Sequence, residues 1–128
     1  DAVPKKYLPT VLSLCDVLFN GWLKRDIYRF GVSPNKWIDY MFSGRPILLA
    51  LSADSTIFME ANCGWQIEAE NAEQLLNSLM EIRSLSTSHL NHLGMNGREY
   101  LLENLTYITL TKKMKIYLEQ SIKVFANG

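Results

Sequence analysis

The chain has 128 residues, of which 48% are hydrophobic, enough for one domain with a sizeable core. Its 13 basic and 13 acidic residues balance, so no strongly basic field exists to hold nucleic acid, and no nucleic-acid partner is expected. No apolar run reaches the roughly 18 residues that would span a membrane, and the N-terminus does not have the pattern of a signal peptide.

The first half of the chain alternates helices and strands. Apolar residues at helical spacing predict a helix over residues 5–14. Residues 17–20 are expected to form a short strand, and residues 21–29 a loop or an irregular helix. A helix over 34–43 then precedes a strand over 46–51, whose continuous apolar run indicates burial on both faces.

The same alternation continues after residue 52. A short helix over about 56–62 is expected to stop before Gly64, and a third strand follows over 65–68. Asn71 is expected to cap the next helix. Its core-facing residues recur at helical spacing: Leu75, Leu76, Leu79, Met80, Ile82 and Leu85.

Two further helices are expected near the C-terminus. The first follows a Ser/Thr break at 86–88, is interrupted near Gly94 and Gly97, and runs through Leu102. The last begins at about Leu110. Its apolar side contains Met114, Tyr117, Leu118, Ile122 and Phe125. Its opposite side carries Lys112, Lys113, Lys115 and Lys123.

This order of elements predicts an α/β fold. Alternating strands and helices are typical of a Rossmann-like, three-layer arrangement, in which a parallel sheet carries helices on both faces. Three strands make a small sheet, and the edges of a sheet normally need protection. We therefore expect either that neighbouring strands belong to a longer protein or that the edge pairs with a second copy, which would give a homodimer.

Residues 31–49 carry the most functional information. Gly31 suits a sharp turn because glycine adopts positive φ at no steric cost. Ser33 followed by Pro34 predicts a helix start, with Ser33 as the N-cap and Pro34 at the first helical position. Gly44 is expected to end this helix.

The start of that helix is a candidate phosphate site. The unpaired amides of Asn35 and Lys36 are expected to point out of the positive end of the helix, and the Lys36 ammonium adds a point charge. Asp39 lies on the same helix face as Lys36, where it could accept hydrogen bonds from a ribose diol. The simpler alternative stays open: such helix starts often bind nothing, and Lys36 and Asp39 could form a surface ion pair.

Other reactive side chains carry weaker signals. His89 and His92 could share a helix face, but no third ligand accompanies them, so no metal site is expected. Cys15 and Cys63 fit neither a metal-ligand spacing nor a disulfide framework, and both are expected to be small buried thiols in a reducing cytoplasm. Core or inter-domain packing, rather than stacking on a sugar, is expected for Trp22, Trp37 and Trp65.

The motifs taken together resemble a known family. They are Phe30-Gly-Val-Ser-Pro-Asn-Lys36, Asp39-Tyr-Met41, Gly44-Arg-Pro46, Glu60-Ala-Asn-Cys-Gly64, Gly94-Met-Asn-Gly-Arg98, Tyr100 and Glu103-Asn104. In this order and spacing they resemble the donor-binding, C-terminal half of glycosyltransferases with the two-domain GT-B fold. The match is closest to family 4 (group 1), which builds lipopolysaccharide and capsular polysaccharide, and it extends from about Tyr7 to Leu118.

This resemblance implies that residues 1–128 form a single domain, part of the C-terminal nucleotide-sugar-binding half of a longer enzyme, without the N-terminal acceptor domain. The parent enzyme would be a bacterial glycosyltransferase of the hexosyltransferase type, acting on a lipid-linked or saccharide acceptor. The isolated piece would be inactive. A cytoplasmic location is implied, peripheral to the inner face of the plasma membrane. No metal and no cofactor besides the donor substrate are implied.

The resemblance also implies which residues bind the donor. These are Ser33, Pro34, Asn35, Lys36 and Asp39, with Lys36 stabilising the leaving diphosphate. Family members often carry two glutamates separated by seven residues. Asp39 stands at the second of these positions and Gly31 at the first, so the first acid is missing and a retaining mechanism does not carry over. The family pattern puts Glu60 near the donor, and a helix-surface acid is the alternative.

Two alternatives remain open. The chain could instead be a non-catalytic α/β domain that binds a nucleotide or a protein partner. The last helix, which in GT-B enzymes commonly packs across to the first domain, could instead lie on an acidic membrane surface through its lysines.

Overall fold

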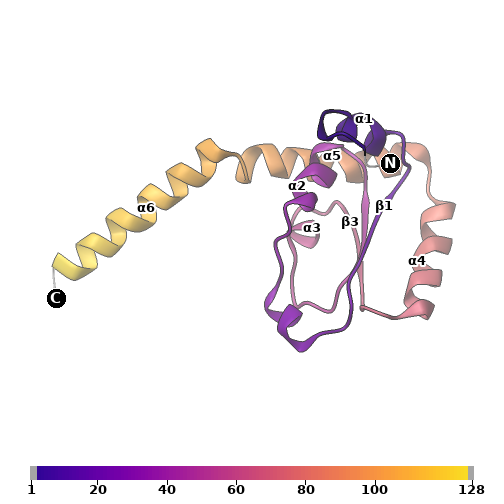
Figure 1. The fold of residues 1–128 in the computed structure, drawn as a ribbon, viewed down its shortest axis with the longest axis horizontal. Coiled ribbons are helices and arrows are strands. Elements are labelled where there is room, and N and C mark those ends of the chain that lie inside the picture. The colour runs from indigo at the N-terminus through magenta and orange to yellow at the C-terminus, as the bar shows by residue number, and fades with distance from the viewer. Residues whose placement is uncertain (1–2, 127–128) are drawn as a thin grey trace.

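The computed structural model describes residues 3–126, and side chains as far as residue 122. Within these limits it contains the strands β1 (Leu18–Gly21), β2 (Ile47–Ala50) and β3 (Gly64–Ile67). Its α-helices are α1 (Leu8–Ser13), α2 (Lys36–Phe42), α3 (Ile57–Glu60), α4 (Ala72–Ser84), α5 (Thr87–Asn104) and α6 (Tyr107–Ala126) (Figure 1). Two 3₁₀ helices, η1 (Lys5–Tyr7) and η2 (Asp26–Phe30), complete the order.

The three strands form one parallel sheet in the order β1-β2-β3. Leu18 pairs with Ile47 at one interface, and Ile47 pairs with Gly64 at the other. All four residues of β2 are buried, as expected for a central strand covered on both faces. The α/β class and the parallel sheet are therefore confirmed.

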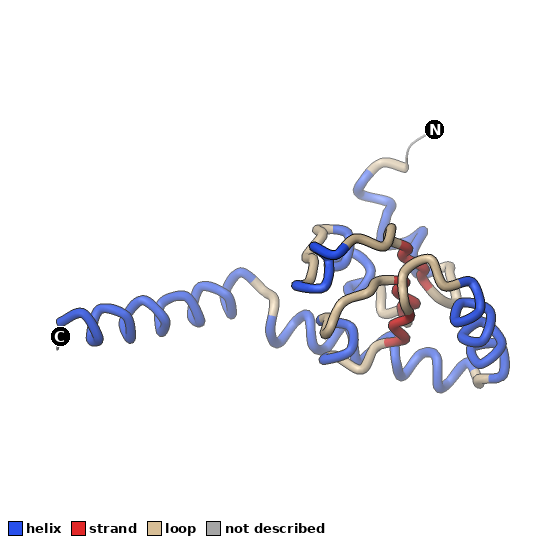
Figure 2. Tube along the Cα trace, turned by 90° about the horizontal axis from the view of Figure 1, so that it is seen from below, coloured by secondary structure: helices blue, strands red, loops and turns tan. Residues whose placement is uncertain are grey.

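Helices cover the two faces of the sheet unequally. On one face, Ile47, Leu49 and Leu51 belong to a large core that includes Trp37 of α2, Phe58 of α3 and Leu101 of α5. On the other face, Leu48, Ala50 and Ile67 form a small cluster, against which Leu75 and Ile82 of α4 pack. Helices thus lie on both sides of the strands (Figure 2), but the second layer is thin.

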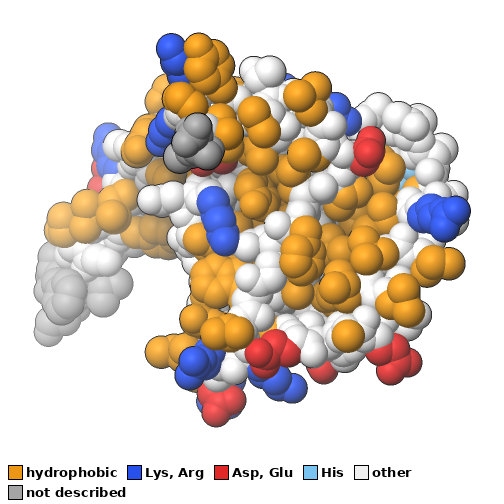
Figure 3. Space-filling model, turned by 45° about the vertical axis from the view of Figure 1, so that its right-hand side comes forward, with side chains coloured by type: hydrophobic (Ala, Val, Ile, Leu, Met, Phe, Trp, Pro, Cys, Tyr) orange, Lys and Arg blue, Asp and Glu red, His pale blue; other side chains and the backbone are white. Residues whose placement is uncertain are grey.

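The predicted core face of α4 is only partly buried. Leu75 and Ile82 are half-buried, whereas Leu76, Leu79 and Met80 are 59%, 49% and 59% exposed. The physical reason is size: α4 has 13 residues, and the strands beneath it have four each, so the sheet is too small to cover the whole apolar face. Figure 3 shows apolar side chains gathered around a hollow on the side of the molecule where α4 lies.

The predicted interruption near Gly94 and Gly97 is wrong, because α5 is continuous through both glycines. A β-carbon at position 94 would overlap the backbone of Gly44, and one at position 97 would lie 2.9 Å from the Cβ of Cys63. These glycines therefore permit α5 to lie close against Gly44 and Cys63, at a cost in intrinsic helix propensity of roughly 1 kcal/mol each.

The last helix begins at Tyr107 rather than at about Leu110. Thr106 precedes it, and its hydroxyl accepts a hydrogen bond from the amide of Thr109 at 3.2 Å. From this junction α6 projects away from the body (Figures 1 and 2). The predicted positions of Lys123 and Phe125 on this helix lie outside the described side chains.

The cysteine and tryptophan predictions hold in part. Cys63 is fully buried as expected, but Cys15 is exposed, because it follows the end of α1 on the surface. Trp37 is a core residue, only 1% exposed. Trp22 and Trp65 are half-buried at the edges of the two clusters.

Candidate functional site

The predicted phosphate site at the start of α2 has a different geometry from that expected. Gly31 has the positive φ that was predicted, +94°. However, α2 begins at Lys36 with Asn35 in the N-cap position, so Ser33 is not the cap and Pro34 is not the first helical residue. The amides of Trp37 and Ile38 donate to the carbonyls of Pro34 and Asn35 at 3.0 and 3.1 Å. These two amides are thus engaged by the chain itself, whereas the predicted phosphate site involves the preceding amides of Asn35 and Lys36.

The anchor of this helix is its buried tryptophan. The indole N–H of Trp37 donates to Oδ1 of Asn20 on β1 at 2.9 Å, and the indole N–H of Trp22 donates to the same oxygen at 3.0 Å. Asn20 is itself buried, 5% exposed. The contact with β1 therefore fixes where α2 lies along the sheet.

Lys36 and Asp39 do not form the surface ion pair considered as an alternative. The Lys36 ammonium instead lies 5.4 Å from the ring centroid of Trp22, the residue that follows β1. The ion pair found among the described residues joins Lys115 and Glu119, far along the chain. Lys36 thus reaches toward the carboxyl end of β1, where a cation–π contact of this kind is weakly favourable.

The other predicted donor residues line two small cavities beside α2. Ser33, Pro34 and Asn35 line a cavity of about 280 Å³ whose remaining walls are mainly apolar, from Trp37, Ile38, Ile57, Leu105 and Leu110. Asn35 and Asp39 line a second cavity of about 270 Å³ with Lys5, Ile38 and Tyr107. The structure therefore brings Asn35 and Asp39 together, whereas Lys36 lines neither cavity.

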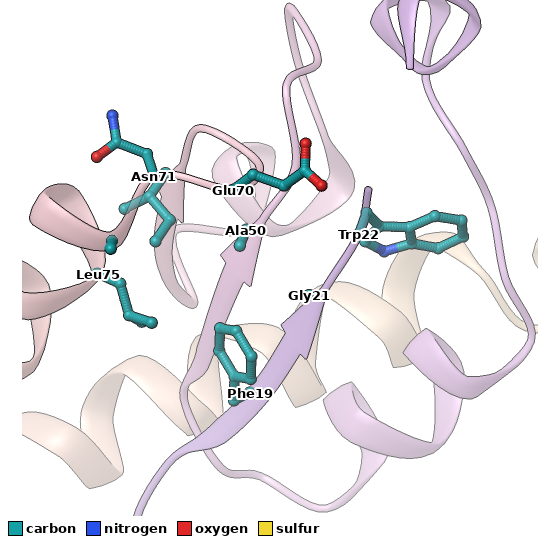
Figure 4. A pocket seen from close by; sticks show the side chains of 9 residues that line it. Phe19, Gly21, Trp22, Ala50, Glu70, Asn71 and Leu75 are labelled. Atoms are coloured by element: carbon teal, nitrogen blue, oxygen red, sulfur yellow. The ribbon is translucent and has the colours of Figure 1, made fainter. Parts of the chain in front are cut away.

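A larger hollow lies at the carboxyl ends of the strands. A mainly apolar cavity of about 300 Å³ is found there (Figure 4). Its walls are Phe19, Gly21, Trp22, Ala50, Ile67, Glu70, Asn71, Ala72 and Leu75. In Figure 4 the ring of Phe19 and the side chain of Leu75 lie on opposite sides of this space, and the ring of Trp22 points away from it.

A polar cavity of about 480 Å³ adjoins the apolar one, since Ile67 lines both. Its other walls are Arg29, Leu51, Ser52, Ala53, Asp54, Gln66, Glu68 and Gln74. Gln66 organises this region: its amide nitrogen donates to the carbonyls of Leu51 and Ala53 at 3.3 and 2.7 Å. Its amide oxygen accepts from the Thr56 hydroxyl at 2.8 Å.

Hydrogen bonds also fix the loops that follow β3. The Glu68 amide donates to Oε1 of Gln74 at 2.8 Å, and the Ala69 amide donates to Oγ of Ser52 at 3.1 Å. Asn71 caps α4 as predicted, since its Oδ1 accepts from the Gln74 amide at 2.9 Å. The two loops at this edge are thus tied to each other and to the start of α4.

The position of the cavities follows from the path of the chain. The sheet grows in one direction from β1 to β3 with α2 and α3 on one face, and α4 then crosses to the other face. Open α/β sheets bind ligands outside the carboxyl ends of their strands, at the point where the strand order reverses. The order β1-β2-β3 of the described strands contains no reversal, so the apolar cavity, between the end of β1 and the start of α4, shares with such sites only its place at the carboxyl edge.

The charge at this edge is mixed. Arg29 lines the polar cavity together with Asp54 and Glu68, and Glu70 lines the apolar one. A ligand phosphate would be repelled by the carboxylates and attracted to the side of Arg29. The cavities themselves suit an uncharged ring and its hydroxyl groups better than a bare diphosphate.

Sequence reasoning missed Arg29, Gln66 and Glu70 as site residues. One signal could have found two of these regions, because the polar residues at 52–54 and 68–71 directly follow two strands and must share one sheet edge. Arg29 gave no such signal, since it lies at the end of the segment 21–29, expected to be a loop or an irregular helix, and meets the edge only through the tertiary fold.

Glu60, which the family pattern puts near the donor, lies elsewhere. Its Oε2 accepts a hydrogen bond of 2.7 Å from the Tyr100 hydroxyl on α5, and this bond raises the pKa of Tyr100, with smaller contributions from burial and from the Glu60 charge. Asn96 of the same helix donates to the carbonyl of Asn62 at 3.1 Å. These contacts lie before β3 begins, at the opposite end of the sheet from the cavities.

No protein-family model matches the chain, and no curated protein or solved structure matches it either. The likeness to glycosyltransferases therefore stands on the motifs alone. Among residues 3–126, no group of three or more potential metal ligands comes together, and no helix is long and apolar enough to cross a membrane.

Proposed function

We propose that this chain is the nucleotide-sugar donor-binding domain of a GT-B glycosyltransferase that acts in cell-surface polysaccharide synthesis at the cytoplasmic side of the plasma membrane. The observation that carries the proposal is the pair of adjoining cavities at the carboxyl edge of a parallel sheet. The order of the motifs from Phe30 to Asn104 supports the choice of family.

Within this proposal the apolar cavity takes the nucleobase, against Phe19 and Leu75. The polar cavity takes the hydroxyl groups of ribose or sugar near Gln66 and Gln74. The phosphates lie toward Arg29 and Lys36, where positive charge stabilises a leaving diphosphate. The residues first predicted, Ser33, Pro34, Asn35 and Asp39, define a competing location beside α2.

Backbone NMR of the chain, titrated with UDP, GDP and ADP, tests both the function and the location. A single domain should bind its nucleotide weakly, with a dissociation constant on the order of 0.1–1 mM. Selective shifts at residues 52–54 and 68–71 support the carboxyl-edge site, whereas shifts at 33–39 support the site beside α2. No shift with any nucleotide at several times these concentrations contradicts the function.

Variants sharpen the comparison. Arg29→Ala and Lys36→Ala are expected to weaken nucleotide binding, and Asp39→Ala is expected to weaken it only if the ligand lies beside α2. Arg25→Ala is the matched control, because Arg25 is an exposed arginine four residues before Arg29 that lines neither cavity. Equal effects of Arg25→Ala and Arg29→Ala would show that only the overall charge matters.

A second function is favoured by one observation, the partly uncovered apolar surface on the α4 side of the sheet. Phe19 on the edge strand is 52% exposed and lines the apolar cavity together with Leu75 of α4. A non-catalytic domain that binds a protein partner or a second copy through this surface would lose that interaction when Phe19 is replaced by Glu. If a nucleotide binds at the carboxyl edge, a domain that binds only a protein partner or a second copy is excluded.

A further inference from the structure

The helix α6 is the most exposed element of the molecule. It leaves the body at Leu105–Thr106 and extends alone (Figures 1 and 2). Every described side chain from Leu110 to Ile122 is exposed. A helix of 20 residues is about 30 Å long, and most of the stability of helices in proteins comes from packing of an apolar face. A helix that projects in this way is expected to meet a partner.

The apolar residues of α6 form a continuous stripe. Apart from the adjacent pair Tyr117 and Leu118, they follow one another at spacings of three or four residues, and they are 43–91% exposed. The stripe consists of Tyr107, Leu110, Met114, Tyr117, Leu118 and Ile122. The exposed apolar side chains of α6 therefore form one surface rather than isolated positions.

The charge of α6 is predominantly positive. The helix contains four lysines and one glutamate, a net charge of +3, in a chain whose total positive and negative charges balance. The remainder of the chain, with nine basic and 12 acidic residues, therefore carries −3. Lys113 and Lys115 precede and follow Met114, so they are turned about 100° to either side of the stripe and flank it.

This arrangement distinguishes between possible partners. In a pair of α6 helices from two copies, Lys113 and Lys115 would lie along the contact and meet lysines, with Glu119 as the single acid to offset them. Glu119 already lies 3.8 Å from Lys115 of its own helix. An anionic lipid surface has no such conflict: the apolar stripe enters the headgroup region, and flanking lysines extend to the phosphates.

We propose that α6 is a membrane-surface helix, which binds anionic lipid bilayers through the stripe and the flanking lysines. It lies along the surface, since none of the described helices is long and apolar enough to cross a bilayer. This proposal does not rest on the nucleotide site at the carboxyl edge of the sheet. Only the first residues of the stripe, Tyr107 and Leu110, also line the cavities beside α2.

Sedimentation of the whole chain with lipid vesicles tests it. Vesicles of phosphatidylglycerol mixed with phosphatidylcholine are compared with vesicles of phosphatidylcholine alone. We expect binding to the anionic vesicles that weakens as salt is raised. Lys112→Gln, Lys113→Gln and Lys115→Gln combined should reduce partitioning on the order of 100-fold, at about fivefold for each lysine.

A matched control carries the same loss of charge elsewhere. Lys5, Lys6 and Lys24 are exposed and lie outside α6, so their combined replacement by glutamine should leave binding nearly unchanged. Met114→Glu, which places a charge in the stripe, should abolish binding to the vesicles. The circular dichroism spectrum of this variant should remain that of the folded protein. Absence of binding to anionic vesicles at low salt would overturn the proposal. An equal loss of vesicle binding in the two triple Lys→Gln variants, one within α6 and one outside it, would also overturn it. A vesicle-independent dimer that Met114→Glu dissociates would show instead that the stripe binds a second copy.

Discussion

Gly94 on α5 lies so close to Gly44 that no side chain fits between the two backbones. One turn later, a β-carbon at Gly97 would lie 2.9 Å from the Cβ of Cys63, and Gly44 has the φ of +69° that turns the chain from α2 into β2. A main-chain contact at Gly94, a close contact of Gly97 with the Cys63 side chain and the buried side chain of Leu101 thus hold α5 in place. The motif residues that resemble the glycosyltransferase family serve this packing.

Gly94→Ala is expected to destabilise the protein by about 1–3 kcal/mol, because the new methyl group would overlap the backbone of Gly44, which cannot move without disturbing β2. The sign of this change in the free energy of unfolding is informative, since in an unconstrained helix the same Gly→Ala replacement would stabilise by roughly 1 kcal/mol. Urea unfolding measures the difference. His92→Ala, at an exposed position of the same helix, is the control, and an unchanged or higher midpoint for Gly94→Ala would contradict the close contact.

Asn20→Leu should remove the acceptor that both Trp22 and Trp37 use. The indole N–H of Trp37 would then be buried without a partner, which costs about 1–3 kcal/mol. Chemical denaturation gives the change in the free energy of unfolding. Asn77→Leu, on the exposed side of α4, is the comparison, and similar small effects of the two replacements would show that the shared hydrogen bonds contribute little.

The two cysteines should differ strongly in reactivity. Cys15 is exposed, whereas Cys63 is buried with its thiol 3.5 Å from the carbonyl of Phe58. Burial raises the pKa of Cys63 from 9.0 to about 12, so the reactive thiolate is scarce at neutral pH. With a thiol reagent at pH 8, one equivalent should react rapidly and the second only on unfolding. Rapid reaction of both thiols in the folded protein would contradict the buried position.

The same pKa shift makes stability depend on pH. Between pH 9 and about 12 the unfolded chain loses the Cys63 proton and the folded chain keeps it. The contribution of this group to the free energy of unfolding is therefore complete below pH 9 and declines as the pH rises toward 12. Comparing urea midpoints of the natural chain and Cys63→Ala across this range isolates the effect, and parallel pH profiles of the two proteins would refute it.

The hydrogen bond between Tyr100 and Glu60 should be visible in a tyrosine titration. Glu60 raises the pKa of Tyr100, first by accepting its hydrogen bond and then by its charge. Glu60→Gln should therefore lower the pKa of Tyr100 toward its ordinary value. Carbon-13 NMR of labelled tyrosines follows each hydroxyl separately. Glu99→Gln, also an exposed acid near Tyr100 in the sequence, is the control and should leave that pKa higher than in Glu60→Gln.

Local patterns in the sequence predicted the elements that local physics decides. The apolar run at 46–51 contains the buried central strand β2 (Ile47–Ala50), Asn71 caps α4, and Gly31 adopts positive φ, since each outcome depends on a few neighbouring residues. Ser33 was misassigned as a cap because the start of α2 is set by the contact of Trp37 with a distant strand.

The remaining errors have the same origin in long-range contacts. Gly94 suggests a helix break unless the backbone of Gly44 lies against it, and no local pattern reveals that contact. The burial of Leu79 depends on how wide the sheet is. The cavities at the carboxyl edge are formed by four parts of the chain, at residues 19–22, 29, 50–54 and 66–75, so the motif at 31–49 could not predict these walls.

The unequal covering of the sheet has a consequence for how the molecule opens. The contacts of α4 with the sheet come from a cluster of three buried residues, whereas α2, α3 and α5 share the large core on the other face. Partial opening events begin in the elements with the fewest buried contacts. We expect the amides of α4 to exchange with deuterated solvent faster than those of β2 and α5. Such a transient opening would also widen the apolar cavity at the end of β1, giving a bulky ligand a route of entry that the closed form does not show.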